Sequence, residues 1–488
     1  MKMVSRNIIA WLTRLALSVT LILLIGCAVG PRYSKPPVET PPAYKEIGNW
    51  KQAQPSDQLP RGKWWEVFQD QQLNAFEDQI EVSNQNLKAA EAQYRQARAL
   101  LRYNRADFFP TLTGGASATR VHTSSNRPPP GTILSGQTYT DLVMPFDVSY
   151  EADVWGRVRR NVEASREQAQ ASAADLAGVN LSMHSNLALF YFQARSLDSQ
   201  EHLLNSTVAD YEKALQLTQN RFSGGLASAL DVSQAQTQLE ATRAQATDIG
   251  VLRAQYEHAI ATLIGKPASS FSLAALPLTS GPPSIPVGVP SQLLERRPDI
   301  SSGERRVAAA NAQIGVAKAA YFPLISLGGS GGFESSSVSS WLTGPSALWS
   351  LGPSAVVTLL DFGRRRAVSE QARAAYDQNV ASYRETVLNS FQQVEDNLAA
   401  LRILEQESKV QDAAVAAAQR SLAVSLNRYK GGLADYLTVT TAQTAVLVNQ
   451  RTAVQILGER LTATVQLIQA LGGSWNVSDL PADLSASR

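Results

Sequence analysis

Two parts of the chain alternate apolar and polar residues, which is the period of a β-strand with one apolar and one polar face. The clearest alternation runs from Phe146 to Asp153, and its expected partner covers residues 111–121. A second pair of strands is expected at residues 324–333 and 349–360. The first strand of that pair contains glycines, which lower strand stability: Gly328, Gly329, Gly331 and Gly332.

Two longer stretches have the period of a helix. Residues 157–222 and 364–429 contain no proline. The second stretch spaces its apolar residues three and four positions apart, as in a coiled coil: Tyr376, Val380, Tyr383, Val387, Phe391, Val394, Leu398 and Leu401. A helix of this length is a rod of roughly 100 Å, and each rod is expected to return as a second helix.

A shorter helix is expected before each strand pair, at about residues 73–105 and 300–320. Each of these helices ends before a Phe-Pro step, because proline disfavours helix in the residue that precedes it. The pattern is therefore mixed but mainly α.

The same motif occurs twice in the chain. Residues 221–227 (RFSGGLA) recur as residues 428–434 (RYKGGLA), 207 positions later. At the same shift, Trp155-Gly156-Arg157 matches Phe362-Gly363-Arg364. A repeated register of this kind predicts an internal duplication. The two units are residues 64–280 and 281–488, each with a helix, a β-hairpin (110–153 and 323–361) and a long helical hairpin (157–265 and 364–472), and the second ends in a C-terminal tail.

The first 26 residues have the pattern of a secretory signal. Lys2 and Arg6 precede an apolar run over residues 8–25, and the only cysteine, Cys27, follows it. A permanent membrane helix is the alternative, although Arg14 would be costly inside a bilayer. Residues 27–63 are rich in proline and are expected to form an N-terminal tether.

Composition and charge point away from nucleic acid and from catalysis. The 44 basic and 42 acidic residues leave a net charge of +2, so no basic nucleic-acid-binding face is expected. The histidines, at positions 122, 184, 202 and 258, have no metal-binding spacing, and no Gly-x-Ser-x-Gly or Walker motif occurs. We therefore expect no enzyme activity, no metal and no cofactor.

The four expected strands allow two interpretations. They could form a small soluble sheet that packs on the helices, or they could span a membrane with one face to lipid and one to a lumen. Four strands cannot close a barrel, and lipid tolerates no open sheet edge. If the strands do span a membrane, several chains must combine them, and three chains give 12.

The repeated motif is expected at the tips of the two helical hairpins. Its glycines permit the left-handed conformation that ends a helix, which is enough to explain a tight reversal. The apolar leucine in both copies is not explained in this way, and an exposed apolar tip suggests a docking surface. The candidate docking residues are Gly224, Gly225, Leu226, Ala227, Gly431, Gly432, Leu433 and Ala434.

Taken together, these features resemble the TolC-type outer-membrane factors, in particular the lipoprotein branch that includes OprM and NodT. The resemblance covers essentially the whole mature chain. It rests on the lipobox at Cys27, Trp64-Trp65 before the first helix, residues 296–300 (RRPDI) at the start of the second unit, Phe322-Pro323, and the paired tips.

The resemblance implies an outer-membrane homotrimer with a 12-stranded β-barrel and a long coiled-coil helical barrel that extends into the periplasm. It implies N-palmitoyl and S-diacylglycerol groups on Cys27 as an anchor in outer-membrane lipid. It also implies docking of a periplasmic adaptor protein at the tips, an inner-membrane pump as the energy source, and passive export of small molecules such as drugs.

A periplasmic aperture is expected just beyond the tips. Leu230 and Leu437 are equivalent across the repeat, and a leucine ring could close a narrow pore by excluding water. Many relatives carry an aspartate where this chain has Thr441, so the nearby acids Asp231 and Asp435 are candidates to replace it. Tyr429 matches a position that helps to hold the closed state in some relatives, or it simply packs.

Two other functions remain open at this point. A structural coiled-coil lipoprotein of the periplasm would need the strand pairs to be soluble. An outer-membrane conduit for type I protein secretion would keep the same fold and carry a different cargo.

Overall fold

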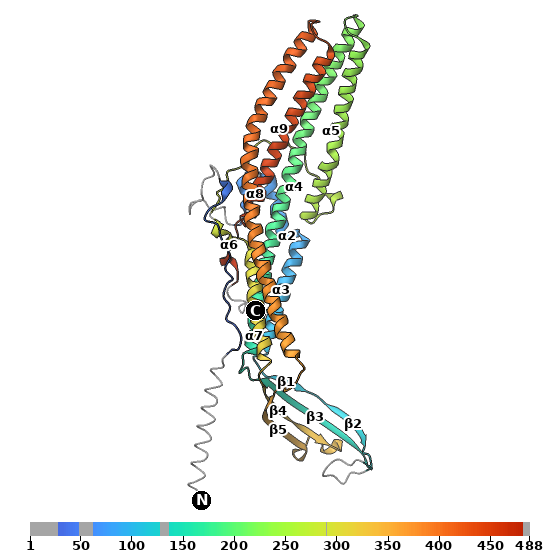
Figure 1. The fold of residues 1–488 in the computed structure, drawn as a ribbon. Coiled ribbons are helices and arrows are strands. Elements are labelled where there is room, and N and C mark those ends of the chain that lie inside the picture. The colour runs from blue at the N-terminus through green and yellow to red at the C-terminus, as the bar shows by residue number, and fades with distance from the viewer. Residues whose placement is uncertain (1–27, 48–61, 127–135, 289, 482–488) are drawn as a thin grey trace.

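The protein is a long helical body with a small sheet at one end (Figure 1). The structure is a computed structural model that describes residues 28–47, 62–126, 136–288 and 290–481. Cys27 and the expected signal segment lie outside the described residues, as does part of the expected tether. Within the described ranges, no helix combines the length and the apolarity that spanning a membrane as a helix requires.

The helical hairpins of the two repeats have the same dimensions. The long helices α4 (Arg157–Ser223) and α8 (Arg364–Lys430) each have 67 residues, and the returning helices α5 (Ala229–Leu263) and α9 (Tyr436–Ala470) each have 35. The apolar seam expected on α8 is buried or half-buried along its whole length. The helical prediction is therefore confirmed to within two residues at each end of α4 and α8.

The prediction of one continuous helix over residues 73–105 is wrong. The segment forms α2 (Gln71–Ser83) and α3 (Gln85–Ala106), separated at Asn84, which has extended backbone angles. The Asn84 side chain caps α3 by accepting from Leu87 N and also donates to Leu263 O at the end of α5, 2.8 Å away. A contact with a distant part of the chain therefore accompanies the break.

The same arrangement recurs in the second repeat. The short helix α6 (Leu293–Arg296) and α7 (Pro298–Ala319) are separated at Arg297. Arg297 Nη1 donates to Ala470 O at the end of α9, 2.9 Å away. Leu263 and Ala470 are 207 residues apart, which is the shift of the repeated motif. The duplication thus extends from sequence to tertiary contacts.

One antiparallel sheet contains the strands of both repeats. Strands β1 (Thr111–Gly114) and β2 (Ser117–His122) follow one another along β3 (Thr138–Glu151). Strand β3 also pairs with β4 (Leu324–Ser335), which pairs with β5 (Ala347–Val356). The expected partner strand at 111–121 is split into two, and the strand expected at 349–360 ends at Val356.

The two faces of this sheet differ in polarity. Residues directly paired in an antiparallel sheet lie on the same face, so the register assigns each residue to one side. One face has Leu112, Phe146, Val148, Leu327, Trp349 and Leu351. The other has Thr111, Asp147, Ser149, Ser330 and Ser350, together with the apolar residues Leu324, Leu348 and Val356. Two glycines of β4 pair opposite large residues: Gly329 opposite Leu351, and Gly331 opposite Trp349 and Phe146.

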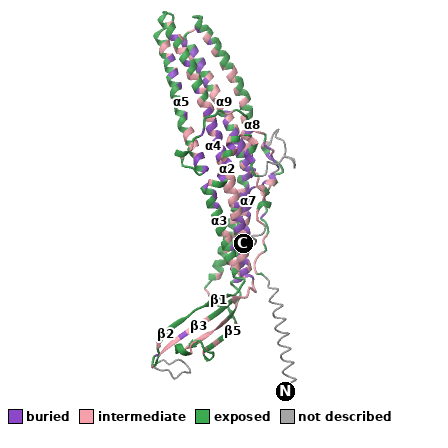
Figure 2. Ribbon diagram, turned by 180° about the vertical axis from the view of Figure 1, so that it is seen from behind, coloured by how far each residue is buried: buried purple, intermediate pink, exposed green. Residues whose placement is uncertain are grey.

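The buried residues gather in the middle of the molecule, where helices of both repeats meet the N-terminal segment (Figure 2). Residues 28–47, the described part of the expected tether, run along α7 and α8. Val29 N donates to Trp155 O at 3.0 Å, Tyr33 donates to Glu304 at 2.5 Å, and Glu395 accepts from the backbone of Lys45 and Glu46. This segment therefore connects the strand end of the body with its middle.

Candidate functional site at the helical tips

Both helical hairpins turn by the same backbone motif. Gly225 N donates to Phe222 O at 2.9 Å and Leu226 N donates to Arg221 O at 2.7 Å. Gly225 has φ of 70° and Gly432, its counterpart in the second tip, has φ of 73°. This is the Schellman motif, in which a left-handed glycine ends the helix.

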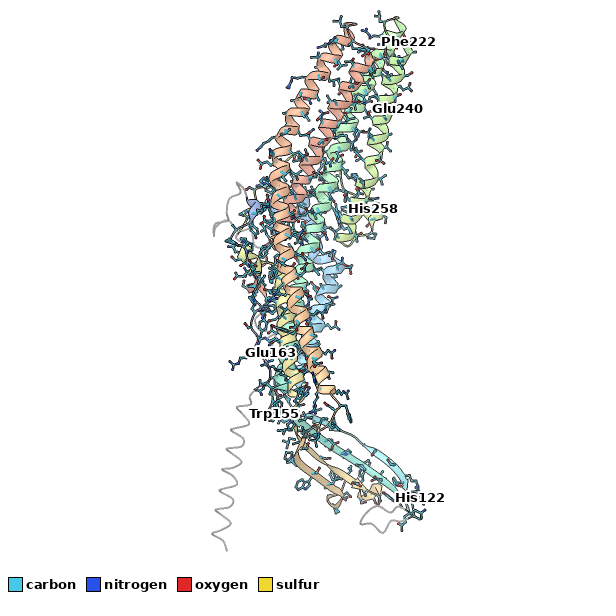
Figure 3. All side chains as sticks on the ribbon, in the orientation of Figure 1. His122, Trp155, Glu163, Phe222, Glu240 and His258 are labelled. Atoms are coloured by element: carbon cyan, nitrogen blue, oxygen red, sulfur yellow. The ribbon has the colours of Figure 1, made fainter. Side chains whose placement is uncertain are left out.

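The motif does not account for the leucine that follows each glycine. In a Schellman motif this position usually packs on an apolar residue in the last turn of the helix. Here the two positions of the last turn that this contact uses are polar: Asn220 and Arg221 in the first tip, and Asn427 and Arg428 in the second. Leu226 is 71% exposed and Leu433 is 73% exposed. The chain therefore presents an apolar residue to solvent at each tip, as the sequence predicted (Figure 3, where Phe222 marks the first tip).

The acidic residues after the tips begin the returning helices. Asp231 and Ser228 form a capping box at the start of α5, and Asp435 accepts from Thr438 N at 3.0 Å at the start of α9. Hydrogen bonds from the Thr438 hydroxyl and the Thr438 backbone N–H hold the pKa of Asp435 below its ordinary value. Both acids thus stabilise helix ends, and a cation-attracting ring stays a prediction.

The expected aperture residues are exposed in the single chain. Leu230 and Leu437 are on the first turns of α5 and α9 and are 65% and 55% exposed. Thr441 lies one turn after Leu437 on the same face, and its hydroxyl donates to Leu437 O at 2.9 Å. The leucines are therefore available to meet other copies of the chain.

Tyr429 packs inside the tip. It is only 3% exposed, and its ring meets that of Tyr436 edge to face, with ring centroids 5.3 Å apart. Arg221, which the sequence pattern did not identify as a site residue, lies over the Tyr429 ring at 4.8 Å and donates to Lys430 O. Arg221 is the first residue of the repeated motif, so the repeat itself could have identified it as a candidate. Its contacts with Tyr429 and Lys430 link the first hairpin to the second.

A groove separates the two hairpins below the tips. Its volume is about 610 Å³, and it is lined by α4, α8 and α9. Its apolar lining residues include Leu217, Leu422 and Leu426. The periodicity of the sequence could not predict this groove, because the groove depends on how the two hairpins lie side by side.

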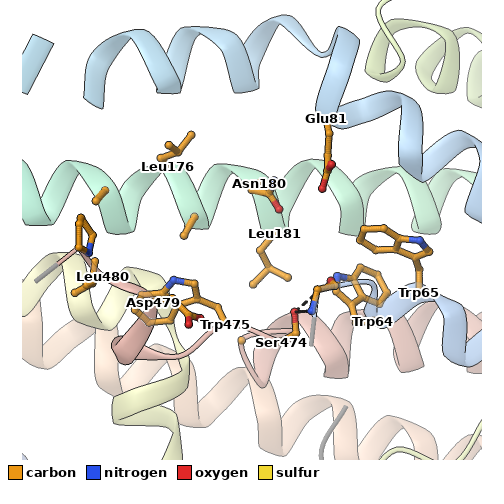
Figure 4. A pocket seen from close by; sticks show the side chains of 15 residues that line it. Trp64, Trp65, Glu81, Leu176, Asn180, Leu181, Ser474, Trp475, Asp479 and Leu480 are labelled. Atoms are coloured by element: carbon orange, nitrogen blue, oxygen red, sulfur yellow. Dashed lines mark hydrogen bonds between the residues drawn. The ribbon is translucent and has the colours of Figure 1, made fainter. Parts of the chain in front are cut away.

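A second cavity lies in the middle of the body, away from the tips (Figure 4). It also has a volume of about 610 Å³ and is lined by Trp64, Trp65, Leu181 and Trp475, among others. Gly62 N donates to Ser474 Oγ at 3.0 Å across one side. The cavity adjoins the ends of the described ranges at Gly62 and Pro481.

Known proteins share this architecture over nearly the whole chain. The solved outer-membrane channel OprN has a TM-score of 0.86 and 29% identity, covering 92% of this chain and 100% of its own. The Campylobacter jejuni CmeC outer membrane channel has a TM-score of 0.86 and 25% identity, covering 94% and 97%. The helical body and its sheet are thus those of outer-membrane channels.

The sequence comparisons agree with the structural ones. The family profile described as "Outer membrane efflux protein" matches residues 78–266 and 289–473, one match in each repeat. The Pseudomonas putida solvent efflux pump outer membrane protein SrpC is 32% identical over 464 residues, covering 94% of this chain and 97% of its own length. The chain belongs to the outer membrane efflux protein family.

Proposed function

We propose that the chain is the exit duct of a tripartite efflux system, through which small molecules leave the cell passively across the outer membrane. The observation that carries this proposal is the two-faced sheet joined to a helical body with apolar tips. Relatives named for efflux of solvents support a small-molecule cargo. No catalytic residue and no cofactor enter the proposal.

The duct is formed by three copies of the chain. In the described sheet, β5 forms one edge, and β1 and β2 form the other. Since β1 and β2 succeed one another along β3, each chain supplies four strand positions, and three chains supply 12. The apolar face would then meet lipid and the polar face would line the lumen.

A lipid on Cys27 anchors the end of the molecule that carries the sheet. Ala28 lies against Gly156, so closely that a Cβ on Gly156 would be 2.8 Å from Ala28 Cα. Gly156 directly precedes α4, at the junction with the strands. Cys27, the proposed site of the N-palmitoyl and S-diacylglycerol groups, directly precedes Ala28 in the sequence, which supports an anchor near the sheet.

The tips dock a periplasmic adaptor, which connects the duct to an inner-membrane pump that supplies the energy. The exposed leucines and the groove beneath them support this assignment. Leu230 and Leu437 form the apolar aperture, with Tyr429 packed behind it.

Native mass spectrometry and bilayer conductance test the proposal. We expect a trimer whose chains begin at triacylated Cys27. Leu437→Ser should raise the resting conductance, because a serine ring cannot exclude water as a leucine ring does. A monomer that lacks conductance would contradict the duct and favour a structural lipoprotein. Normal drug susceptibility in a deletion strain, with loss of a secreted protein, would favour type I secretion.

A further inference from the structure

The segment that joins β5 to α8 exposes apolar side chains beside the sheet. Leu359 is 88% exposed, Leu360 is 71% exposed and Phe362 is 94% exposed. Three consecutive arginines follow at the start of α8, Arg364, Arg365 and Arg366. Residues 359–366 thus place exposed apolar side chains directly before three basic ones.

The backbone of this segment holds Phe362 in an unfavourable conformation. Its φ is 50°, in the left-handed region that a bulky side chain rarely adopts. The equivalent residue of the first repeat, Trp155, is packed instead. Its ring stacks on Phe322 with centroids 4.7 Å apart, and its indole N–H donates to Pro323 O at 2.8 Å. Burial in the described chain does not explain why Phe362 points outward.

The surrounding junction carries an excess of positive charge. Over residues 102–109, 151–160, 318–323 and 361–366 there are nine basic and four acidic residues, an excess of five, whereas the whole chain has an excess of two. If Glu163 and Glu370, which pair with Arg160 and Arg366, are also counted, an excess of three positive charges remains.

Arg364 and Arg366 are the most accessible part of this charge on α8. Arg365 pairs with Asp361 at 2.6 Å, whereas no carboxylate among the described residues pairs with Arg364. The Arg366 side chain is 82% exposed, and its pair with Glu370 is exposed on both sides. The helix dipole also disfavours cations in a first turn, so helix stability does not explain three arginines there.

The position of the segment matches a membrane interface. It lies where the strands meet the helices, near the Trp155 label in Figure 3. The segment lies between the sheet, which has an apolar face, and the helices, which have polar surfaces. Basic residues at this level attract anionic phospholipid headgroups, and aromatic side chains lie between lipid and water.

We propose that residues 359–366 bind anionic phospholipid of the periplasmic leaflet, with Leu359 and Phe362 in the bilayer and Arg364 and Arg366 on the lipid phosphate. This inference goes beyond the proposed export function, although it relies on the outer-membrane location. It distinguishes the second repeat from the first, in which the equivalent aromatic residue packs internally.

Lipid titration of the delipidated, detergent-purified full chain tests the proposal. Bound lipids are counted by native mass spectrometry with phosphatidylglycerol or phosphatidylcholine added. We expect a preference for phosphatidylglycerol and, in the Arg364→Gln/Arg366→Gln double variant, a fall in affinity for it of about 30-fold. Phe362→Ser should weaken binding of both lipids.

A matched control removes the same charge from the same helix. Arg384 and Arg420 are exposed on α8, the nearer of them about 27 Å above Arg366. Arg384→Gln/Arg420→Gln should bind lipid as the wild type does. Equal binding of the two lipids, or unchanged binding in the Arg364 and Arg366 variant, would overturn the proposal. Loss of oligomers in that variant would also overturn it, because the segment would then contact a second copy. Drug export tests the duct separately.

Discussion

At the scale of single residues, one buried pair sets the first repeat apart. Glu77 on α2 and His184 on α4 are 0% and 1% exposed, and His184 Nδ1 lies 2.7 Å from Glu77 Oε2. The His184 ring stacks on Trp65 with centroids 4.3 Å apart. At the repeat shift of 207, the second repeat has Phe391 in place of His184. The pair is therefore not a requirement of the fold.

Removing one member of this pair should destabilise the protein more than removing both. Glu77→Leu or His184→Phe alone leaves a buried polar group without its partner, which costs about 1–3 kcal/mol. The Glu77→Leu/His184→Phe double variant should recover most of that loss, as Phe391 suggests. Thermal unfolding of the four proteins checks this, and additive losses would contradict it.

The pair should also make stability depend on pH. Burial lowers the pKa of His184 to about 4 and raises the pKa of Glu77, so the two groups act in opposite directions. Glu77→Gln leaves His184 as the titrating member of the pair. Because its pKa is lower in the folded protein, the unfolded chain binds a proton at this histidine before the folded chain does as the pH falls. Stability of this variant should be full above about pH 6.5 and fall towards pH 4. A flat melting temperature across that range would contradict the assignment.

At the scale of elements, the two repeats share a way of fixing helix ends. Gly265 and Gly472 follow α5 and α9 with φ of 69° and 89°. A Cβ on either would overlap a backbone carbonyl, of Ser83 or of Arg296. These glycines therefore allow the end of a returning helix to approach the break between α2 and α3, or between α6 and α7.

Gly472→Ala should destabilise the protein more than Gly225→Ala. Both positions have positive φ, but nothing lies within 4 Å of a Cβ on Gly225. The tip variant should lose about 1 kcal/mol from backbone strain, and the Gly472 variant should lose more because the carbonyl must move. Thermal unfolding of both variants measures the difference, and equal losses would show that the close approach does not matter.

The tips should need their leucines for export but not for folding. Leu226→Asp or Leu433→Asp places a charge on an exposed apolar tip, so drug resistance should be lost while the trimer level stays unchanged. Val410→Asp is the control, since Val410 is 67% exposed on α8 away from the tip. Normal resistance in both tip variants would remove the docking assignment.

At the scale of the whole molecule, the chain has two surfaces that a single copy leaves open. The sheet has unpaired edges at β5 and at β1 and β2, and its apolar face carries exposed Trp349 and Leu351. The expected strand continuation after Val356 is also without a partner in the described chain. These features fit a molecule that is completed by other copies and by lipid.

Two neighbouring residues on β5 should respond in opposite ways to the same substitution. Leu351→Lys places a charge on the apolar face, which costs about 2–4 kcal/mol if that face meets lipid. Ser350→Lys places it on the polar face and should be tolerated. Heat-modifiable trimers in outer-membrane fractions are the measurement. Equal assembly of the two variants would contradict the assignment of the faces.

The element types, the duplication and the exposed tip leucines follow from the amino-acid sequence alone. These depend on local periodicity, on glycine and proline conformations and on a repeated motif, all of which can be read along the chain. The sequence therefore placed α4, α8 and their turns to within two residues.

Which of these elements pack against one another follows from the folded arrangement and not from the sequence pattern. The break at Asn84 depends on Leu263, and the joining of the repeats in one sheet depends on the pairing of β3 with β4. The packing of Arg221 on Tyr429 and the burial of Glu77 with His184 are also contacts between distant segments. The periodicity of a single segment does not indicate such contacts, because they form only when separate elements pack together.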